Sequence, residues 1–334
     1  MFVDKILYKG EEYTRIHKGT ELIAETPITM DESLTIVGAT SISVVDNGTA
    51  THNIEYYDTS VGSWNAMTGP ITPQGKVYLR GNIHTKDVNN YCHIVVENNN
   101  INDDSVYIGG NLGSINGGHR VCTSDTIFAS LFRDNYGLVI GSNTFAPNLI
   151  LPYMSGIPGV YERLFMGVTF GDTFMPYELL STTGVSKGAF NSAFRESNIL
   201  AAPNLPVSKV IPSTCYANMF NRCRDLRIVL DMELSADEIG KEACLQMFYL
   251  CSSLDETPVL KIKTLNDSCY KNMFKGCSNL NYIKCLATDI SATDCTYDWV
   301  NGVRSTGTFI KSANMSGWTT GTSGIPAGWT VENE

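Results

Sequence analysis

The feature that most restricts the fold of this chain is a short motif that recurs with a period in the twenties. Three copies are clear: CYANMFNRCRDL at 215–226, CLQMFYLCSSL at 244–254 and CYKNMFKGCSNL at 269–280. In each copy a Phe is followed three residues later by a Cys and six residues later by a Leu. A fixed period of this length predicts stacked units, because one such unit cannot bury its apolar face alone.

Weaker copies extend the pattern toward the N-terminus. It can be followed through six residues that are 33, 29, 26, 28 and 26 positions apart: Phe132, Phe165, Phe194, Phe220, Phe248 and Phe274. The segment through each Phe reads as a short helix or helical turn, and the Leu at the sixth position opens an extended run such as LNYIKCL at 280–286. We therefore predict one short strand, one helical turn and a loop per unit, with Phe, Leu and Cys facing inward.

The ten cysteines are the first candidates for chemistry. Structural zinc sites take ligands about two to four residues apart, with a matching second pair. By contrast, Cys215 and Cys223 are eight positions apart, as are Cys269 and Cys277. Since Cys is small and often fully buried, we predict that these side chains are packing residues, reduced in a cytosol. Zinc binding, and disulfide formation after release from a cell, remain as alternatives.

Other patterns exclude most function classes. The net charge of −10 would repel phosphate backbones, so no nucleic acid is expected as a partner. No window approaches about 18 apolar residues and the first residues do not read as a signal peptide, so we expect no membrane insertion. The sequence has no HExxH or P-loop pattern, and ENNNINDDS at 97–105 lacks calcium-loop spacing. We predict no enzyme, no cofactor and no metal site.

The repeat units resemble BspA-type leucine-rich repeats, which occur in surface proteins of gut bacteria and in virion proteins of their phages. The similarity is strongest over 269–334, which looks like the last repeat and C-terminal cap of that group. It is good over 215–268 and degenerate over 121–214, where the opening Cys is missing. Residues 54–82 are similar to a small β-sandwich that often precedes such repeats, through Trp64 and the KVYLRG edge at 76–81.

The N-terminal part carries a repeat of its own. YKGEEY at 8–13 returns as HKGTEL at 17–22, and it resembles the segments by which phage structural proteins attach to the particle. We thus predict a mixed, β-rich fold: an N-terminal attachment or oligomerisation segment (1–28), a β-sandwich domain (29–120), a leucine-rich-repeat solenoid of short strands and helical turns (121–295) and a C-terminal cap (296–334). The Gly-rich run 107–120 is expected to be a linker between the sandwich and the solenoid.

The function implied is that of a non-enzymatic virion structural protein, a head or tail fibre or appendage. The N-terminal segment would bind other virion proteins, the solenoid would bind a host-surface glycan or protein, and the chain would form a homo-oligomer, a trimer or a dimer. Its location would be the virion, assembled in the host cytoplasm. The alternative is a bacterial cell-surface adhesin, and an enzyme acting on surface polysaccharide is a third reading. The predicted partner-binding residues on the strands are Arg227, Glu256, Tyr282 and Lys284.

Overall fold

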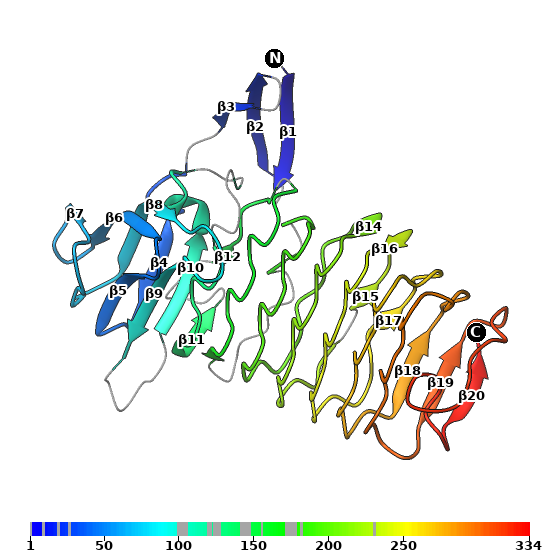
Figure 1. The fold of residues 1–334 in the computed structure, drawn as a ribbon. Coiled ribbons are helices and arrows are strands. Elements are labelled where there is room, and N and C mark those ends of the chain that lie inside the picture. Colours follow the sequence, from blue (N-terminus) through cyan, green and yellow to red (C-terminus); the bar gives the residue numbers. More distant parts are fainter. Residues whose placement is uncertain are drawn as a thin grey trace.

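The computed structural model describes residues 2–8, 11–18, 21–25, 28–98, 106–118, 122, 128–140, 148–154, 156–170, 179–180, 183–229 and 232–334. Within these residues the chain is strand and turn almost throughout (Figure 1). The one helix of the described part is a single 3₁₀ turn, η1 (Leu112–Ile115). The β-rich part of the predicted fold class is therefore confirmed, whereas its helical turns are not found.

A three-stranded antiparallel sheet begins the chain. It consists of β1 (Phe2–Tyr8), β2 (Glu11–Lys18) and β3 (Glu21–Glu25), paired in sequence order. The attachment or oligomerisation role of this segment stays a prediction.

The next part is a sandwich of two sheet layers. In the larger sheet β4 (Leu34–Val37), β8 (Val77–His84), β6 (Thr51–Asp58) and β7 (Trp64–Ala66) are antiparallel neighbours in that order. The second layer is the antiparallel pair β5 (Ser41–Asp46) and β9 (Cys92–Glu97). Val77 and Leu79 face the core, and Ile42 and Ile94 enter it from the second layer. Buried and more exposed side chains alternate along β8 and β9, because period two places every second side chain on one face.

The Gly-rich run 107–120 is not a linker, and that prediction was wrong. It contains the central strand β10 (Val106–Asn111) followed by the buried turn η1. β10 pairs with β4 on one side and with β11 (Tyr136–Ile140) on the other, and also with β12 (Leu149–Ile150); β13 (Thr169–Phe170) extends the sheet beyond β11. Glycine is required at position 110, since its φ is +80° and a Cβ would lie 2.0 Å from the carbonyl oxygen of Ser33. The sandwich and the following units thus share one sheet.

The units that follow are built from runs of overlapping turns, which we call turn runs. Each run is counted from its first residue with positive φ through the residue after its last one, which gives 159–168, 188–197, 214–223, 242–251, 268–277 and 294–303, and 128–135 for the described part of the first run. Along a run, every second amide bonds to the carbonyl three positions back, as Cys215 does to Pro212 at 3.2 Å. The amides between them bond across to the next run, as Tyr216 does to Ala243 at 2.8 Å. In the four runs from 188–197 to 268–277 every backbone N–H is therefore paired without any helix.

A positive φ at every fourth residue gives the turn runs their shape. In 214–223 it falls at Thr214, Asn218 and Arg222, with φ between 55° and 64°. An α-helix requires negative φ throughout, so these runs cannot be helical. The predicted leucine-rich-repeat solenoid of short strands and helical turns is therefore wrong, and the observed chain is a set of β-sheets joined to stacked turn runs.

The segments between turn runs form short parallel strands. β14 (Val210–Ile211) pairs with β16 (Glu238–Ile239). A five-stranded parallel sheet, the C-terminal sheet, follows in the order β15 (Glu233–Leu234), β17 (Val259–Leu260), β18 (Tyr282–Cys285), β19 (Thr308–Lys311) and β20 (Thr330–Asn333). Successive strands lie beside one another at the C-terminal end of the molecule (Figure 1).

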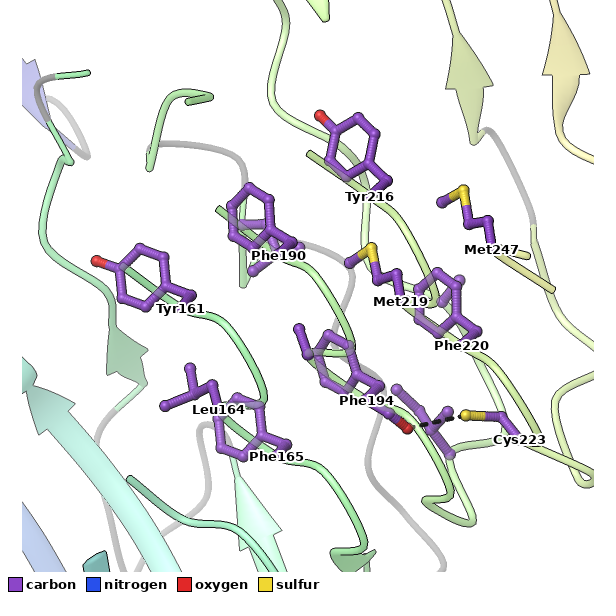
Figure 2. Close-up of a cluster of buried hydrophobic side chains, with 14 of the residues drawn as sticks. Tyr161, Leu164, Phe165, Phe190, Phe194, Tyr216, Met219, Phe220, Cys223 and Met247 are labelled. Carbon is purple, nitrogen blue, oxygen red and sulfur yellow. Dashed lines mark hydrogen bonds between the residues drawn. The ribbon is translucent and has the colours of Figure 1, made fainter. Parts of the chain in front are cut away.

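The core of the stacked part is made of columns of aromatic rings (Figure 2). The ring centroids of the repeated Phe residues are 5.3–5.7 Å apart, and each ring stacks on the next from Phe132 to Phe274. A second column joins Phe128, Tyr161, Phe190 and Tyr216 at 5.7–5.9 Å. The inward orientation predicted for the Phe and Leu residues of the motif is confirmed by their complete burial. Stacked rings add to the stabilisation that burial itself provides.

The motif cysteines also face inward, and their thiols are hydrogen-bond donors. The Sγ atoms of Cys223, Cys251 and Cys277 lie 2.9–3.0 Å from the carbonyl oxygen of the Phe in the preceding run. Figure 2 shows this bond from Cys223 to the Phe194 carbonyl. All ten cysteines are free and buried. The prediction that they are packing residues is confirmed, with a donor role that the sequence did not suggest.

Candidate binding surface

The structure brings three of the four predicted partner-binding residues together on the C-terminal sheet. Glu256 is exposed and forms a parallel bridge with Tyr282. Tyr282 and Lys284 are half-buried and lie two positions apart on β18, so they share its outer face. Arg227 is also exposed, but its amide bonds to the Leu200 carbonyl at 3.1 Å, and no described contact joins its side chain to the other three.

The strand register defines a row of outward side chains beside Lys284. Leu234, Leu260 and Cys285 are aligned and buried, so the residues that precede them point outward. On the other side of β18, Lys284 is aligned with Ile310 of β19, and Ile310 is aligned with Glu332 of β20. We call these five aligned residues the outer row: Glu233, Val259, Lys284, Ile310 and Glu332.

Two ion pairs run along this face. Lys284 Nζ lies 2.8 Å from Glu334 Oε1, and Lys261 Nζ lies 2.5 Å from Glu233 Oε1. The hydrogen bond to Glu334 raises the pKa of Lys284 above its ordinary value. All four side chains remain at least 24% exposed, and such pairs contribute little to folding. Their charges are therefore available to a partner.

Sequence reasoning missed Glu233, Lys261 and Glu334. The first two could have been found from the alternation around Leu234 and Leu260, once the register of β15 and β17 is known. Glu334 carries no such signal, because it reaches Lys284 only after the chain has passed through β19 and β20. The surface as a whole is a mixed polar and apolar strip that offers charges of both signs and one aromatic ring.

Burial favours the protonated form of the motif thiols at neutral pH. Burial raises the pKa of Cys223 and of Cys277 to about 12, and that of Cys251 well above its ordinary value. Reactive or metal-binding cysteines need the thiolate form. Among the described residues no group of three or more His, Cys, Asp or Glu side chains is arranged to hold a metal ion.

In the part of the chain that the structure describes, no helix has the length and apolar character needed to cross a bilayer. No protein-family model, curated protein or solved structure shows a significant match to this chain.

Proposed function

We propose that the protein is a non-enzymatic structural protein of a virion, a head or tail fibre or appendage, that presents the outer face of its C-terminal sheet to a host-surface glycan or protein. The observation that carries this proposal is the outer row with its two ion pairs. These polar side chains point away from a core that the aromatic columns already fill, so they are not needed for stacking. Extended faces of stacked units bind partners through surfaces of this kind.

The virion part of the proposal comes from the resemblance in the repeat units and in the N-terminal segment. We further propose that residues 1–28 bind other virion proteins and hold the chain in a homo-oligomer, a trimer or a dimer. Most soluble oligomers are symmetric, and a segment of about 28 residues is too short to be expected to form a core of its own, so it would gain stability from such association. Light scattering of the full chain, beside a chain lacking residues 1–28, measures this directly: equal masses for the two would contradict it.

The location is tested by negative-stain microscopy of phage particles with an antibody against residues 269–334. Regular labelling of capsids or tails supports the proposal and shows which part of the particle carries the protein. Bare particles beside labelled bacterial cells would refute it and favour the adhesin.

The binding surface is tested with the double variant Tyr282→Ala and Lys284→Ala. Adhesion of the purified chain to host cells should fall, because both side chains lie on the outer face of β18 and neither is part of the core. The matched control is Tyr136→Ala, which removes a ring that is 74% exposed on β11. Equal adhesion of the double variant and the control would show that the C-terminal sheet is not the binding surface.

A further inference from the structure

An open pocket of about 320 Å³ lies on the sandwich. Its walls come from β6, β7 and β8, from the segment before β4, and from η1 and the turn after it; they include Glu55, Trp64, Arg80, Gly81, Ser114 and Gly118. Ligand sites in proteins begin at about this volume. The pocket shares no residue with the outer row.

Three side chains from three neighbouring strands form one wall. The Arg80 guanidinium lies over the Trp64 ring, with its central carbon 3.9 Å from the ring centroid. Arg80 Nε and Nη2 both contact Glu55 Oε2, each at 2.7 Å. Cation–π stacking and a charged hydrogen bond together hold a planar cation in one orientation. These contacts hold the Arg80 guanidinium in place in the absence of a ligand, although the Arg80 and Glu55 side chains are each more than 40% exposed.

The floor of the pocket has little hydrogen-bonding capacity left. Ser114 Oγ donates to the Leu79 carbonyl at 2.8 Å and accepts from the Leu34 amide at 3.0 Å. Ser33 Oγ donates to the Thr29 carbonyl at 3.0 Å. The hydroxyl hydrogens of both serines are therefore already used in fixing the sheet. The side-chain donors left for a ligand are the N–H groups of Arg80 outside the ion pair, and Glu55 Oε1, which that pair does not use, is an acceptor.

Glycines with positive φ line the pocket. At Gly81 φ is +123° and a Cβ would lie 2.0 Å from the Asn53 carbonyl oxygen, so no other residue fits there. At Gly118 φ is +81° and nothing lies within 4 Å of an added Cβ, so this backbone borders free space. A residue with positive φ and no side chain lets a ligand approach the main chain closely.

The lining selects a ligand by its charge and shape. Arg80 and Glu55 neutralise each other, so the wall attracts neither an anion nor a cation strongly. An aromatic ring and the partly exposed Met30 offer apolar contact, while a fork of donors and one carboxylate acceptor stand beside them. A sugar ring has this combination, with C–H groups on its faces and hydroxyls, which both donate and accept, around its edge.

We propose that this pocket binds a neutral, hydroxyl-rich sugar residue, with Trp64 as the stacking surface and the Arg80–Glu55 pair as the hydrogen-bonding edge. The site would give the sandwich a glycan-binding role of its own. The proposal stands on the pocket and does not depend on the virion assignment or on the outer row.

The test applies the full-length protein to a glycan array that carries neutral oligosaccharides ending in hexoses or N-acetylhexosamines, together with sialylated and sulfated ones. The wild-type chain should bind a subset of the neutral glycans. Trp64→Ala should weaken that binding about ten-fold or more, since the stacking surface is lost. Tyr136→Ala, which removes an exposed ring on β11 that belongs neither to the pocket nor to the outer row, should leave it unchanged.

A second variant keeps the test decisive if Trp64→Ala disturbs the fold. Glu55→Gln preserves the shape of the side chain but leaves the positive charge of Arg80 without its counter-charge. Binding should therefore shift from neutral glycans toward sialylated or sulfated ones, an effect that a purely structural role of Glu55 would not produce. Three results would overturn the proposal: no neutral glycan bound above background, wild-type binding confined to acidic glycans, or binding that neither variant changes.

Discussion

Replacing Gly276 by Ala is the most direct test of the turn runs. A left-handed backbone and a helical turn predict changes of opposite sign in the free energy of unfolding. Gly276 has a φ of +79° in the run 268–277. An L-residue in the left-handed region costs about 1–2 kcal/mol. In a helical turn, the same change would stabilise the protein by about 1 kcal/mol, since Ala is the better helix former. The sign of the change in unfolding free energy therefore distinguishes the two structures.

A second contribution at this position comes from the neighbouring run. A Cβ at position 276 would lie 2.4 Å from Leu250 Cδ2. That atom is the end of a flexible, half-buried side chain, so it can move at a cost of about 1 kcal/mol. We expect Gly276→Ala to lower the unfolding free energy by about 2–3 kcal/mol. Urea denaturation of the full chain, followed by circular dichroism, measures this change.

Gly302 provides the matched control, because it occupies the equivalent position in the next run. Its φ is +81°, and an added Cβ would be 3.5 Å from Gly276 Cα, an ordinary contact. Gly302→Ala should therefore cost only the backbone part, about 1–2 kcal/mol. In a chain that also carries Leu250→Ala, the added clash is absent. The loss of unfolding free energy caused by Gly276→Ala should then approach the loss caused by Gly302→Ala. An increase in stability for either single glycine variant would refute the left-handed backbone.

Three further predictions concern the core and the sandwich. Phe248→Ala should destabilise the protein by about 3–5 kcal/mol in urea unfolding, because the ring is fully buried between two stacked neighbours. Cys251→Ser keeps a donor toward the Phe220 carbonyl and should be more stable than Cys251→Val by about 1 kcal/mol in the same assay. Burial pushes the pKa of Asp58 up, but its hydrogen bonds from residues 60 and 74 outweigh burial and hold the pKa below its ordinary value. This stabilisation is present above the unfolded-state pKa of about 3.9 and is lost as the pH falls through the lower folded value, so Asp58→Asn should flatten the fall in melting temperature below about pH 4.

The sequence predicted the burial of the repeated side chains correctly but assigned the wrong backbone to them. In the run 214–223 the buried aromatic and sulfur-containing side chains stand at offsets 0, 1, 4, 5 and 8 from Cys215. A helix has a period of about 3.6, which is close enough to four to give the same apolar pattern over two turns. The apolar patterns of a four-residue period and of a helix can be told apart only in segments longer than these runs.

A local signal for the true backbone was nevertheless present. The positions with positive φ often carry Asn, Asp or Gly, as at Asn218, Asn272, Asp294, Asp298 and Gly276. These residue types tolerate the left-handed region best. Leu250 and Arg222 hold the same conformation without that preference. Tertiary stacking therefore overrides local propensity at some positions and hides the pattern.

The candidate surfaces were predictable only where they depend on one strand. The alternation of β18 places Tyr282 and Lys284 on the outer face, and this follows from the sequence alone. The pairing of Lys284 with Glu334, and the meeting of Glu55, Trp64 and Arg80 across β6, β7 and β8, require the strand order of the sheets. Such contacts arise from topology, for which a single sequence offers no periodic signal.

Because of the alternating amide bonds of the turn runs, the molecule can be shortened without breaking the bonding pattern only by removing whole repeat units. Corresponding residues of the runs 242–251 and 268–277 are 26 positions apart, and each run offers its neighbours the same pattern of amides and carbonyls. Excising residues 243–268 would join Glu242 to Cys269 with every left-handed position, ring column and thiol still in phase. A cut half that size would not. We therefore expect a chain shortened by one whole unit to keep this bonding pattern and to be about 5 Å shorter, one strand spacing.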